Sequence, residues 1–485
     1  MKKLLLVTFC MSFSFASASS VLGFQSVNGV GQLRNLIGTE NANGSGVDLL
    51  QVEAVRVLRD TNDIDNDGDT REILERYYGP HTTNGQFDGK TFQVFGDPPS
   101  DGPSSHASGV GFDLYGNSLG AAGGIGDSGS PPISITSASN FINNSLINGG
   151  GTPDVFTHNV SNHSYIADLD DENSTSENPF FEEDAVEVLR RLDYSINEGN
   201  MTTVVGTSNG ATAELPALFV QSYNTINVGR ADGSHASGLT TLNGTGRNAI
   251  HLVTNETTTS GATAVVSGLA SILHQTGSPI TSATNQEVIK ATLLAGATKD
   301  IIPGDWDNSS PQPLDEVFGA GQANIFNSYL IQQAGEMNGT AAGGVLSPTT
   351  DFNGWDYGID FETEDELFYE FLVDSNTRLE ELSIALTWNI GIEDGTPNSF
   401  SFNPESELAN LSLELFDSTG AIYEFSDSSV DNIEHLYFDT LSEGTYRLRV
   451  FNNSSENVST DFALAFRSSV VSAVPEPCSS TLLIG

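Results

Sequence analysis

The sequence has few cysteines and few positive charges. Its 485 residues include 2 cysteines, 18 lysines and arginines, and 63 aspartates and glutamates, which gives a formal net charge of −45. A nucleic-acid partner is excluded because phosphate contacts need positive charge, and binding to anionic membrane surfaces is disfavoured for the same reason. This charge is typical of a soluble protein in salty water, where counterions screen its self-repulsion.

The N-terminus has the features of a secretory signal peptide at 1–18. Two lysines precede an apolar run, and Ala16-Ser17-Ala18 provides a cleavage site of small residues. We expect cleavage after Ala18, which removes Cys10 and leaves only Cys478, near the C-terminus. With no internal disulfide available, stability is expected to come from core packing and bound ions.

Length and pattern predict two main domains. Between 45 and 335, apolar runs alternate with helix-like segments, which predicts an α/β domain with a mostly parallel sheet flanked by helices. We expect buried strands at 47–55, 154–160, 202–208 and 225–229, and helices at 182–196 and 285–297. Short alternating stretches between turn residues predict an all-β antiparallel sandwich at 350–468. The remaining segments are a short N-terminal piece, a linker and a tail, at 19–44, 336–349 and 469–485.

Four polar side chains stand at the ends of expected strands or at the starts of expected helices. They are Glu53 in "GVDLLQVEA", His106 in "SSHASGVG", Asn209 in "VVGTSNGA" and Ser260 in "TTSGATAVVSG". A serine nucleophile needs an imidazole to remove its proton and a carboxylate to orient that imidazole. An amide can donate a hydrogen bond to the developing oxyanion.

Each of these residues also has a structural interpretation. A serine at a helix start is commonly a cap, and an asparagine before glycine is commonly a turn. A histidine among glycines and serines is commonly a loop residue, and a carboxylate that ends a strand is commonly solvated. The order of the four residues and their local patterns are the evidence for a catalytic interpretation.

With these patterns, the first domain resembles the subtilisin-like serine peptidases, whose chain order is acid, histidine, serine. The segment 259–268, "TSGATAVVSG", keeps the Ser, Ala, Thr, Val and Gly of the family's serine signature, and "HASGV" resembles its histidine signature. The resemblance implies a catalytic triad of Glu53, His106 and Ser260 with Asn209 at the oxyanion. It also implies a substrate cleft at Ser164 in "SNHSYI" and a closing helix in "GAGQANIFNSY".

Three departures from the family favour a rival interpretation. Glu53 stands where the family has Asp, Thr258 stands where it has Gly before Thr-Ser, and Ala264 replaces the signature proline. Only about 25 residues separate the signal from the first strand, so we expect no folded inhibitory propeptide. The rival is a non-catalytic surface or matrix protein on a subtilisin-like scaffold. A lectin-like adhesin that acts through the sandwich is a third candidate.

The stretch "DIDNDGDTREIL" places carboxylates at alternate positions, as in a calcium loop. Its acids are Asp63, Asp65, Asp67 and Asp69. The twelfth position is Leu74 and not a bidentate glutamate, and a solvated acidic loop is the alternative. No cofactor is expected to be required, so calcium would be structural.

The segment Val474-Pro475-Glu476-Pro477 resembles a PEP-CTERM sorting signal, but the apolar stretch after it is far shorter than the ~20 residues that span a bilayer. A truncated or released copy is therefore expected. The combined prediction is a secreted, monomeric bacterial serine endopeptidase that acts on protein or peptide substrates, with no stable membrane span. Association with the extracellular matrix or cell surface is the alternative location.

Overall fold

A computed structural model describes most of the chain. Its described residues are 28–54, 56–59, 73–96, 102–166, 182–280, 282–299, 306–307, 313–341, 348–349, 352–396 and 401–472. The predicted signal peptide, the acidic residues Asp63, Asp65, Asp67 and Asp69, and the Pro-Glu-Pro tail lie outside these ranges. Their predicted roles therefore stay predictions.

The first part of the chain folds around a parallel sheet of seven strands. Its order is β11 (Leu252–Thr254), β8 (Ile226–Arg230), β7 (Thr202–Gly206), β6 (Val160–His163), β1 (Leu49–Glu53), β5 (Ile133–Ser137) and β4 (Phe92–Val94). Because β1 lies between β6 and β5, with Val52 beside His163 and Glu53 beside Ser137, the carboxyl end of β1 is near the centre of the sheet.

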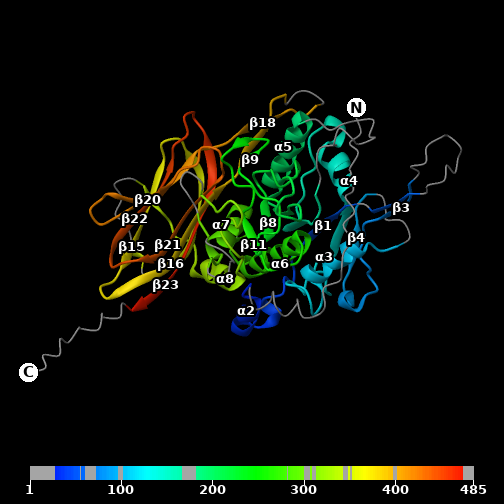
Figure 1. Ribbon diagram of the computed structural model, residues 1–485, viewed down its shortest axis with the longest axis horizontal. Coiled ribbons are helices and arrows are strands. Elements are labelled where there is room, and N and C mark those ends of the chain that lie inside the picture. Colours follow the sequence, from blue (N-terminus) through cyan, green and yellow to red (C-terminus); the bar gives the residue numbers. More distant parts are fainter. Residues whose placement is uncertain are drawn as a thin grey trace, which may run out of the picture.

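Helices cover both faces of this sheet (Figure 1). One face is covered by α3 (Ser105–Tyr115), α6 (Thr259–Gly277), α7 (Gln286–Gly296) and α8 (Ile325–Ala334), with α2 (Val30–Ile37) packed on α8. The other face is covered by α5 (Glu182–Gly199), α4 (Ala138–Asn140) and the helical turn 141–146. Leu49 packs on the first side and Leu50 on the second. Since side chains alternate along a strand, Gln51 and Glu53 share the first side, toward α3 and α6.

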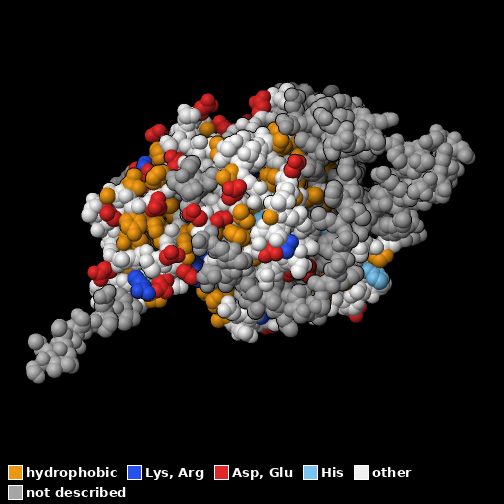
Figure 2. Space-filling model, viewed as in Figure 1, with side chains coloured by type: hydrophobic (Ala, Val, Ile, Leu, Met, Phe, Trp, Pro, Cys, Tyr) orange, Lys and Arg blue, Asp and Glu red, His pale blue; other side chains and the backbone are white. Residues whose placement is uncertain are grey.

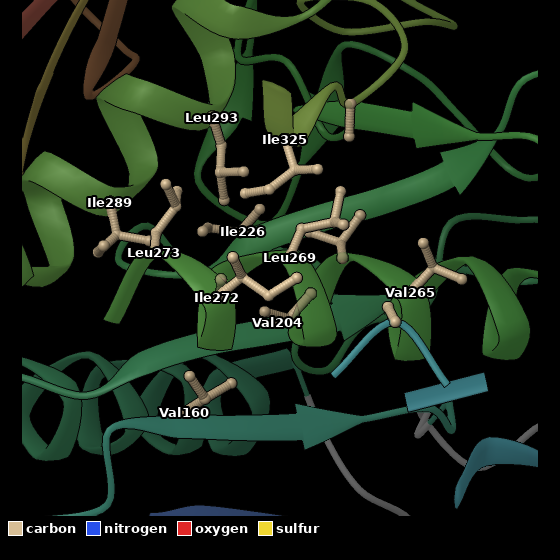
Figure 3. Close-up of a cluster of buried hydrophobic side chains, with 14 of the residues drawn as sticks. Val160, Val204, Ile226, Val265, Leu269, Ile272, Leu273, Ile289, Leu293 and Ile325 are labelled. Carbon is tan, nitrogen blue, oxygen red and sulfur yellow. The ribbon is translucent and has the colours of Figure 1, made fainter. Parts of the chain in front are cut away.

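The core on this side consists of aliphatic side chains from strands and helices (Figure 3). Strand side chains lie against α6, and α7 and α8 complete the cluster, which includes Val160, Val204, Ile226, Val265, Leu269, Ile272, Leu273, Ile289, Leu293 and Ile325. Side chains buried in this way each contribute about 1.5–3 kcal/mol of transfer free energy. The helix that carries Ser260 is therefore fixed by the centre of the core.

The second part is a sandwich of two sheets whose strands pair antiparallel, as predicted, except that β13 (Pro348–Thr349) pairs parallel with its neighbour (Figure 1). One sheet has the order β14 (Asn353–Glu362), β23 (Ser459–Ser472), β16 (Thr377–Trp388) and β21 (Ile433–Leu441). The other contains β12 (Thr340–Ala341), β13 (Pro348–Thr349), β15 (Glu366–Val373), β22 (Gly444–Asn452), β19 (Leu411–Phe416) and β20 (Ile422–Ser426). Between them lies a separate core that includes Phe371, Trp388 and Phe466.

The remaining strands form short hairpins. They are β2 (Arg56–Arg59) with β3 (Ile73–Tyr77), β9 (Thr240–Thr241) with β10 (Gly244–Thr245), and β17 (Gly391–Asp394) with β18 (Pro404–Glu407). The last of these packs on α5. Figure 2 shows aspartate and glutamate side chains spread over the viewed face of the sandwich, with few lysines and arginines among them.

Two details differ from the sequence-based expectation. The strand expected at 154–160 is wrong, because residues 152–158 have no regular structure and β6 covers Val160–His163. Within the segment 336–349 that was expected to be a linker, Thr340–Ala341 and Pro348–Thr349 pair with β15 of the sandwich. Among the described residues, no helix combines the length and apolar character that crossing a membrane requires.

Candidate active site

Glu53 is the last residue of β1 and is completely buried. Its Oε2 lies 2.7 Å from Nδ1 of His106, and its Oε1 accepts a hydrogen bond of 2.7 Å from Nε2 of Gln51. A buried carboxylate is stabilised only where its oxygens have donors. Both oxygens of Glu53 have one, so its side chain is fixed in a single orientation.

His106 is the second residue of α3, whose first turn is capped by Ser104. The Ser104 Oγ accepts a hydrogen bond from the backbone N–H of Ala107 at 3.2 Å. This cap sets the start of the helix and directs the imidazole to the carboxyl end of β1. The His106 side chain is 14% exposed, so the ring lies between the buried carboxylate and the surface.

Ser260 is the second residue of α6, and Thr258 caps this helix. The Thr258 Oγ1 accepts from the backbone N–H of Gly261 at 3.1 Å. The Ser260 Oγ lies 3.1 Å from His106 Nε2. A helix cap was the alternative role for Ser260, but Thr258 is the capping residue. Glu53, His106 and Ser260 therefore form one continuous hydrogen-bonded chain.

Ser164 directly follows β6 and contacts the same serine twice. Its backbone carbonyl oxygen accepts from Ser260 Oγ at 2.9 Å, and its own Oγ donates to the Ser260 carbonyl at 2.9 Å. The Ser260 hydroxyl has a single proton, so the Ser164 carbonyl and His106 Nε2 are alternative acceptors for it. Ser164 is buried, and the described range that contains it ends at 166, so its predicted role in a substrate cleft stays a prediction.

Asn209 lies in the turn beyond β7, where it forms an isolated bridge with His235. Its Oδ1 accepts from the backbone N–H of Thr259 at 2.9 Å. This hydrogen bond fixes the orientation of the Asn209 side-chain amide: its oxygen faces the start of α6, and its nitrogen points away from the Thr259 N–H. Among the first N–H groups of α6, those of Thr259 and Gly261 have side-chain acceptors, and the N–H of Ser260 lies between them at the positive end of the helix dipole.

Two further carboxyl groups close to Ser260 were missed by the sequence analysis. Asp113 on α3 and Glu256 before α6 both lie close to Gly261. A β-carbon added to Gly261 would be 3.2 Å from Asp113 Oδ2 and 3.4 Å from Glu256 Oε2. Burial raises the pKa of Glu256 to about 7, and burial together with Glu256 raises the pKa of Asp113 well above its usual range. Neither residue lies in a family motif, so no sequence signal identified them.

The arrangement therefore brings together Glu53, His106, Ser260, Ser164 and Asn209 from three strand ends and two helix starts. In the described part of the chain, no three or more His, Cys, Asp or Glu side chains are grouped as metal ligands would be. Acyl transfer by a serine requires a buried carboxylate, an imidazole and a hydroxyl that are hydrogen-bonded one to the next.

Comparison with known proteins gives matches of low identity among solved structures. No family model and no curated protein matches the chain. The prenylagaramide maturation protease PagA is 15% identical over 62% of this chain and 98% of its own, with a TM-score of 0.38. Fervidolysin of Fervidobacterium pennivorans, a keratinolytic enzyme related to subtilisin, is 11% identical over 83% of this chain and 67% of its own, with a TM-score of 0.37.

The sandwich has a weaker counterpart. The pre-peptidase C-terminal domain of a Bacillus anthracis collagenase is 14% identical over 26% of this chain and 98% of its own, with a TM-score of 0.18. The order and direction of the strands define the class of the protein: an α/β domain built on a parallel sheet, followed by an antiparallel β-sandwich. At these identities and TM-scores the matches assign neither a family nor an activity to this chain, and the chemistry is inferred from the side chains described above.

Proposed function

We propose that this chain is a secreted serine endopeptidase that acts through an acyl-enzyme. One observation carries the proposal: the hydrogen-bonded chain from Glu53 Oε2 to His106 Nδ1 at 2.7 Å and from His106 Nε2 to Ser260 Oγ at 3.1 Å. A carboxylate on Nδ1 selects the tautomer whose Nε2 is free to accept a proton, and it stabilises the imidazolium that forms.

In acylation, the Ser260 Oγ attacks the scissile carbonyl carbon while its proton moves to His106 Nε2. The tetrahedral intermediate then collapses, the carbon–nitrogen bond breaks, and Nε2 returns the proton to the leaving amine. Water repeats the sequence on the ester, which releases the acid and restores the hydroxyl. Before acylation, the Ser260 proton must point toward His106 Nε2 and not toward the Ser164 carbonyl.

The oxyanion that forms in each step needs donors on its own side of the carbonyl. The amide nitrogen of Asn209 and the backbone N–H of Ser260 are the proposed donors, because Asn209 Oδ1 is already bonded to Thr259. Loss of one such donor typically lowers turnover by about 10²–10³. Substrate is proposed to bind as an extended strand beside Ser164.

A serine-directed phosphonate probe tests the proposal. The wild type should be labelled and should hydrolyse denatured casein, whereas Ser260→Ala should do neither and should melt at nearly the same temperature. Ser271→Ala is the matched control, since this buried serine lies on the same helix and donates to the Ser267 carbonyl at 2.8 Å. A wild type that fails to label would leave the non-catalytic scaffold as the better account.

A further inference from the structure

Behind the proposed triad, two more side chains continue its hydrogen bonds inward. The phenol of Tyr115, at the end of α3, donates to Oε1 of Gln51 at 2.6 Å. The Nε2 of Gln51 donates to Glu53 Oε1 at 2.7 Å, on the opposite oxygen from the one that faces His106. Tyr115, Gln51 and Glu53 are all completely buried, so no solvent competes for these bonds.

The orientation of the Gln51 side-chain amide follows from which of its hydrogen-bond partners can donate and which can only accept. Amide oxygen and nitrogen are assigned from their partners, and Nε2 has two: Glu53 Oε1 and, at 3.2 Å, the backbone carbonyl of Ala107. A carboxylate and a carbonyl only accept, so the nitrogen must face them and the oxygen must face Tyr115. The phenol then has to donate, and burial together with the charge of Glu53 raises its pKa well above the usual range, which keeps its proton in place.

We infer that Gln51 and Tyr115 are positioning residues that hold the Glu53 carboxylate for His106; this inference rests on the proposed peptidase function. Glutamate has one more side-chain torsion than aspartate, so its carboxylate samples more positions unless it is restrained. Gln51 provides the restraint because it lies two residues before Glu53, on the same side of β1. Its second bond, to Ala107, joins that strand to the helix turn that carries His106.

Three variants test the inference: Tyr115→Phe, which removes one oxygen, Gln51→Met, which removes the amide, and their combination. We expect kcat to fall about three- to tenfold in Tyr115→Phe, which loses a hydrogen bond between neutral groups, and about 10- to 100-fold in Gln51→Met, which loses a hydrogen bond to the charged Glu53. The KM should stay unchanged because neither residue contacts substrate. The double variant should be no slower than Gln51→Met, because both residues act through one bond to Glu53.

The matched controls are Tyr369→Phe and Gln332→Met. Tyr369 donates to Asp356 at 2.7 Å within the sandwich, and Gln332 donates to the Leu273 carbonyl at 2.9 Å far along α6. Both are buried, so these controls should lower the melting temperature and leave kcat unchanged. A purely structural role for Gln51 and Tyr115 would give the same result as the controls.

A second readout does not depend on turnover. The proton between His106 Nδ1 and Glu53 should give a downfield proton resonance in the wild type, which Gln51→Met should shift or broaden and Gln332→Met should not. Unchanged kcat and an unchanged resonance in Tyr115→Phe and Gln51→Met would overturn the inference; if Gln51→Met fails to fold, Tyr115→Phe alone decides. A wild type without probe labelling would instead refute the proposed peptidase function.

Discussion

At the scale of single residues, Glu53 shows how the site accommodates a glutamate, whose side chain is one methylene longer than the aspartate expected at this position. Its two carboxylate oxygens have different donors, His106 at Oε2 and Gln51 at Oε1, each at 2.7 Å. A shorter aspartate on the same strand could not reach both donors without movement of β1 or α3, and β1 is hydrogen-bonded on both sides. The site is therefore built for glutamate.

We predict that Glu53→Asp lowers kcat/KM by at least about tenfold, because the hydrogen bond to His106 lengthens and misaligns. Glu53→Gln should lose most activity, by up to about 10⁴, since an amide disfavours the required imidazole tautomer. Steady-state kinetics with a peptide substrate measure both changes. Asp48→Asn at the opposite end of the strand, where Asp48 lies 3.8 Å from His158, is the control and should keep full activity. Higher activity in Glu53→Asp would mean that the site only tolerates glutamate.

The sequence predicted the three residues of the hydrogen-bonded chain because each lies in a recognisable local pattern and the three follow one another in the order acid, histidine, serine. Gln51 was missed although its signal was available: it is two residues before Glu53 and therefore on the same side of the strand. Tyr115 could not be found in this way, because only the packing of α3 on β1 brings its hydroxyl within 2.6 Å of Gln51.

At the scale of elements, α6 fixes the position of Ser260 by burial on all sides. Its residues from Thr259 to His274 are buried apart from Ser260 itself, and Gly268 faces the turn that follows α3. A β-carbon at Gly268 would lie 2.6 Å from the Ala121 β-carbon. The close approach of the two segments that carry Ser260 and His106 therefore depends on this glycine.

We predict that Gly268→Ala destabilises the protein by about 1–3 kcal/mol, because the turn at Ala121 must move away. Gly109→Ala on α3 is the matched control: nothing lies within 4 Å of its added β-carbon, so it should stabilise by about 0.5–1 kcal/mol through helix propensity. Chemical denaturation measures both. Equal shifts in the two variants would show that the contact with Ala121 relaxes at no cost.

The mistaken strand at 154–160 has a physical cause at the same scale. That stretch has more apolar residues, yet Val155 is 44% exposed, whereas the true strand continues into Ser161, Asn162 and His163, which are fully buried. These polar groups find partners only in the folded protein: Ser161 on Thr203, Asn162 on Ser267 and His163 on the Tyr165 hydroxyl. Hydrophobic pattern cannot reveal a strand whose buried side chains are polar and hydrogen-bonded to other polar side chains, two of them distant in the sequence.

At the scale of the whole molecule, α7 joins the two parts. Every residue from Gln286 to Gly296 is buried, with α8 on one side and β16 and β23 of the sandwich on the other. Glu287 lies at this junction, where its Oε1 accepts from Asn389 at 2.7 Å and its backbone carbonyl accepts from Thr387 at 2.9 Å. Burial is the main cause that raises the pKa of Glu287 from 4.5 to about 7.

This shift makes stability depend on pH in a defined direction. The folded state retains the proton of Glu287 up to about pH 7, whereas the unfolded chain releases it near 4.5, so the free energy of unfolding falls as pH rises through that window. In Glu287→Gln this decrease in the free energy of unfolding should disappear, because a glutamine side chain does not ionise. We predict that the variant matches the wild type near pH 4 and exceeds it by about 1–3 kcal/mol above pH 7.

Thermal or denaturant unfolding at several pH values checks this expectation. Glu407→Gln, on the exposed part of β18, is the control and should show no pH-dependent difference from the wild type. A stability difference for Glu287→Gln that is constant between pH 4 and 8 would mean that Glu287 stays ionised at the junction.

The burial of α7 also limits how such a protein can be reshuffled. The buried helix α7 packs both on α8 of the first part and on β16 and β23 of the sandwich. The boundary between the two parts in the sequence, which follows α8, therefore differs from the boundary between their packed surfaces. Recombination that exchanged the sandwich for another would have to preserve the outer side of α7 as well. The sandwich of this protein is therefore packed as one part of a continuous body through α7.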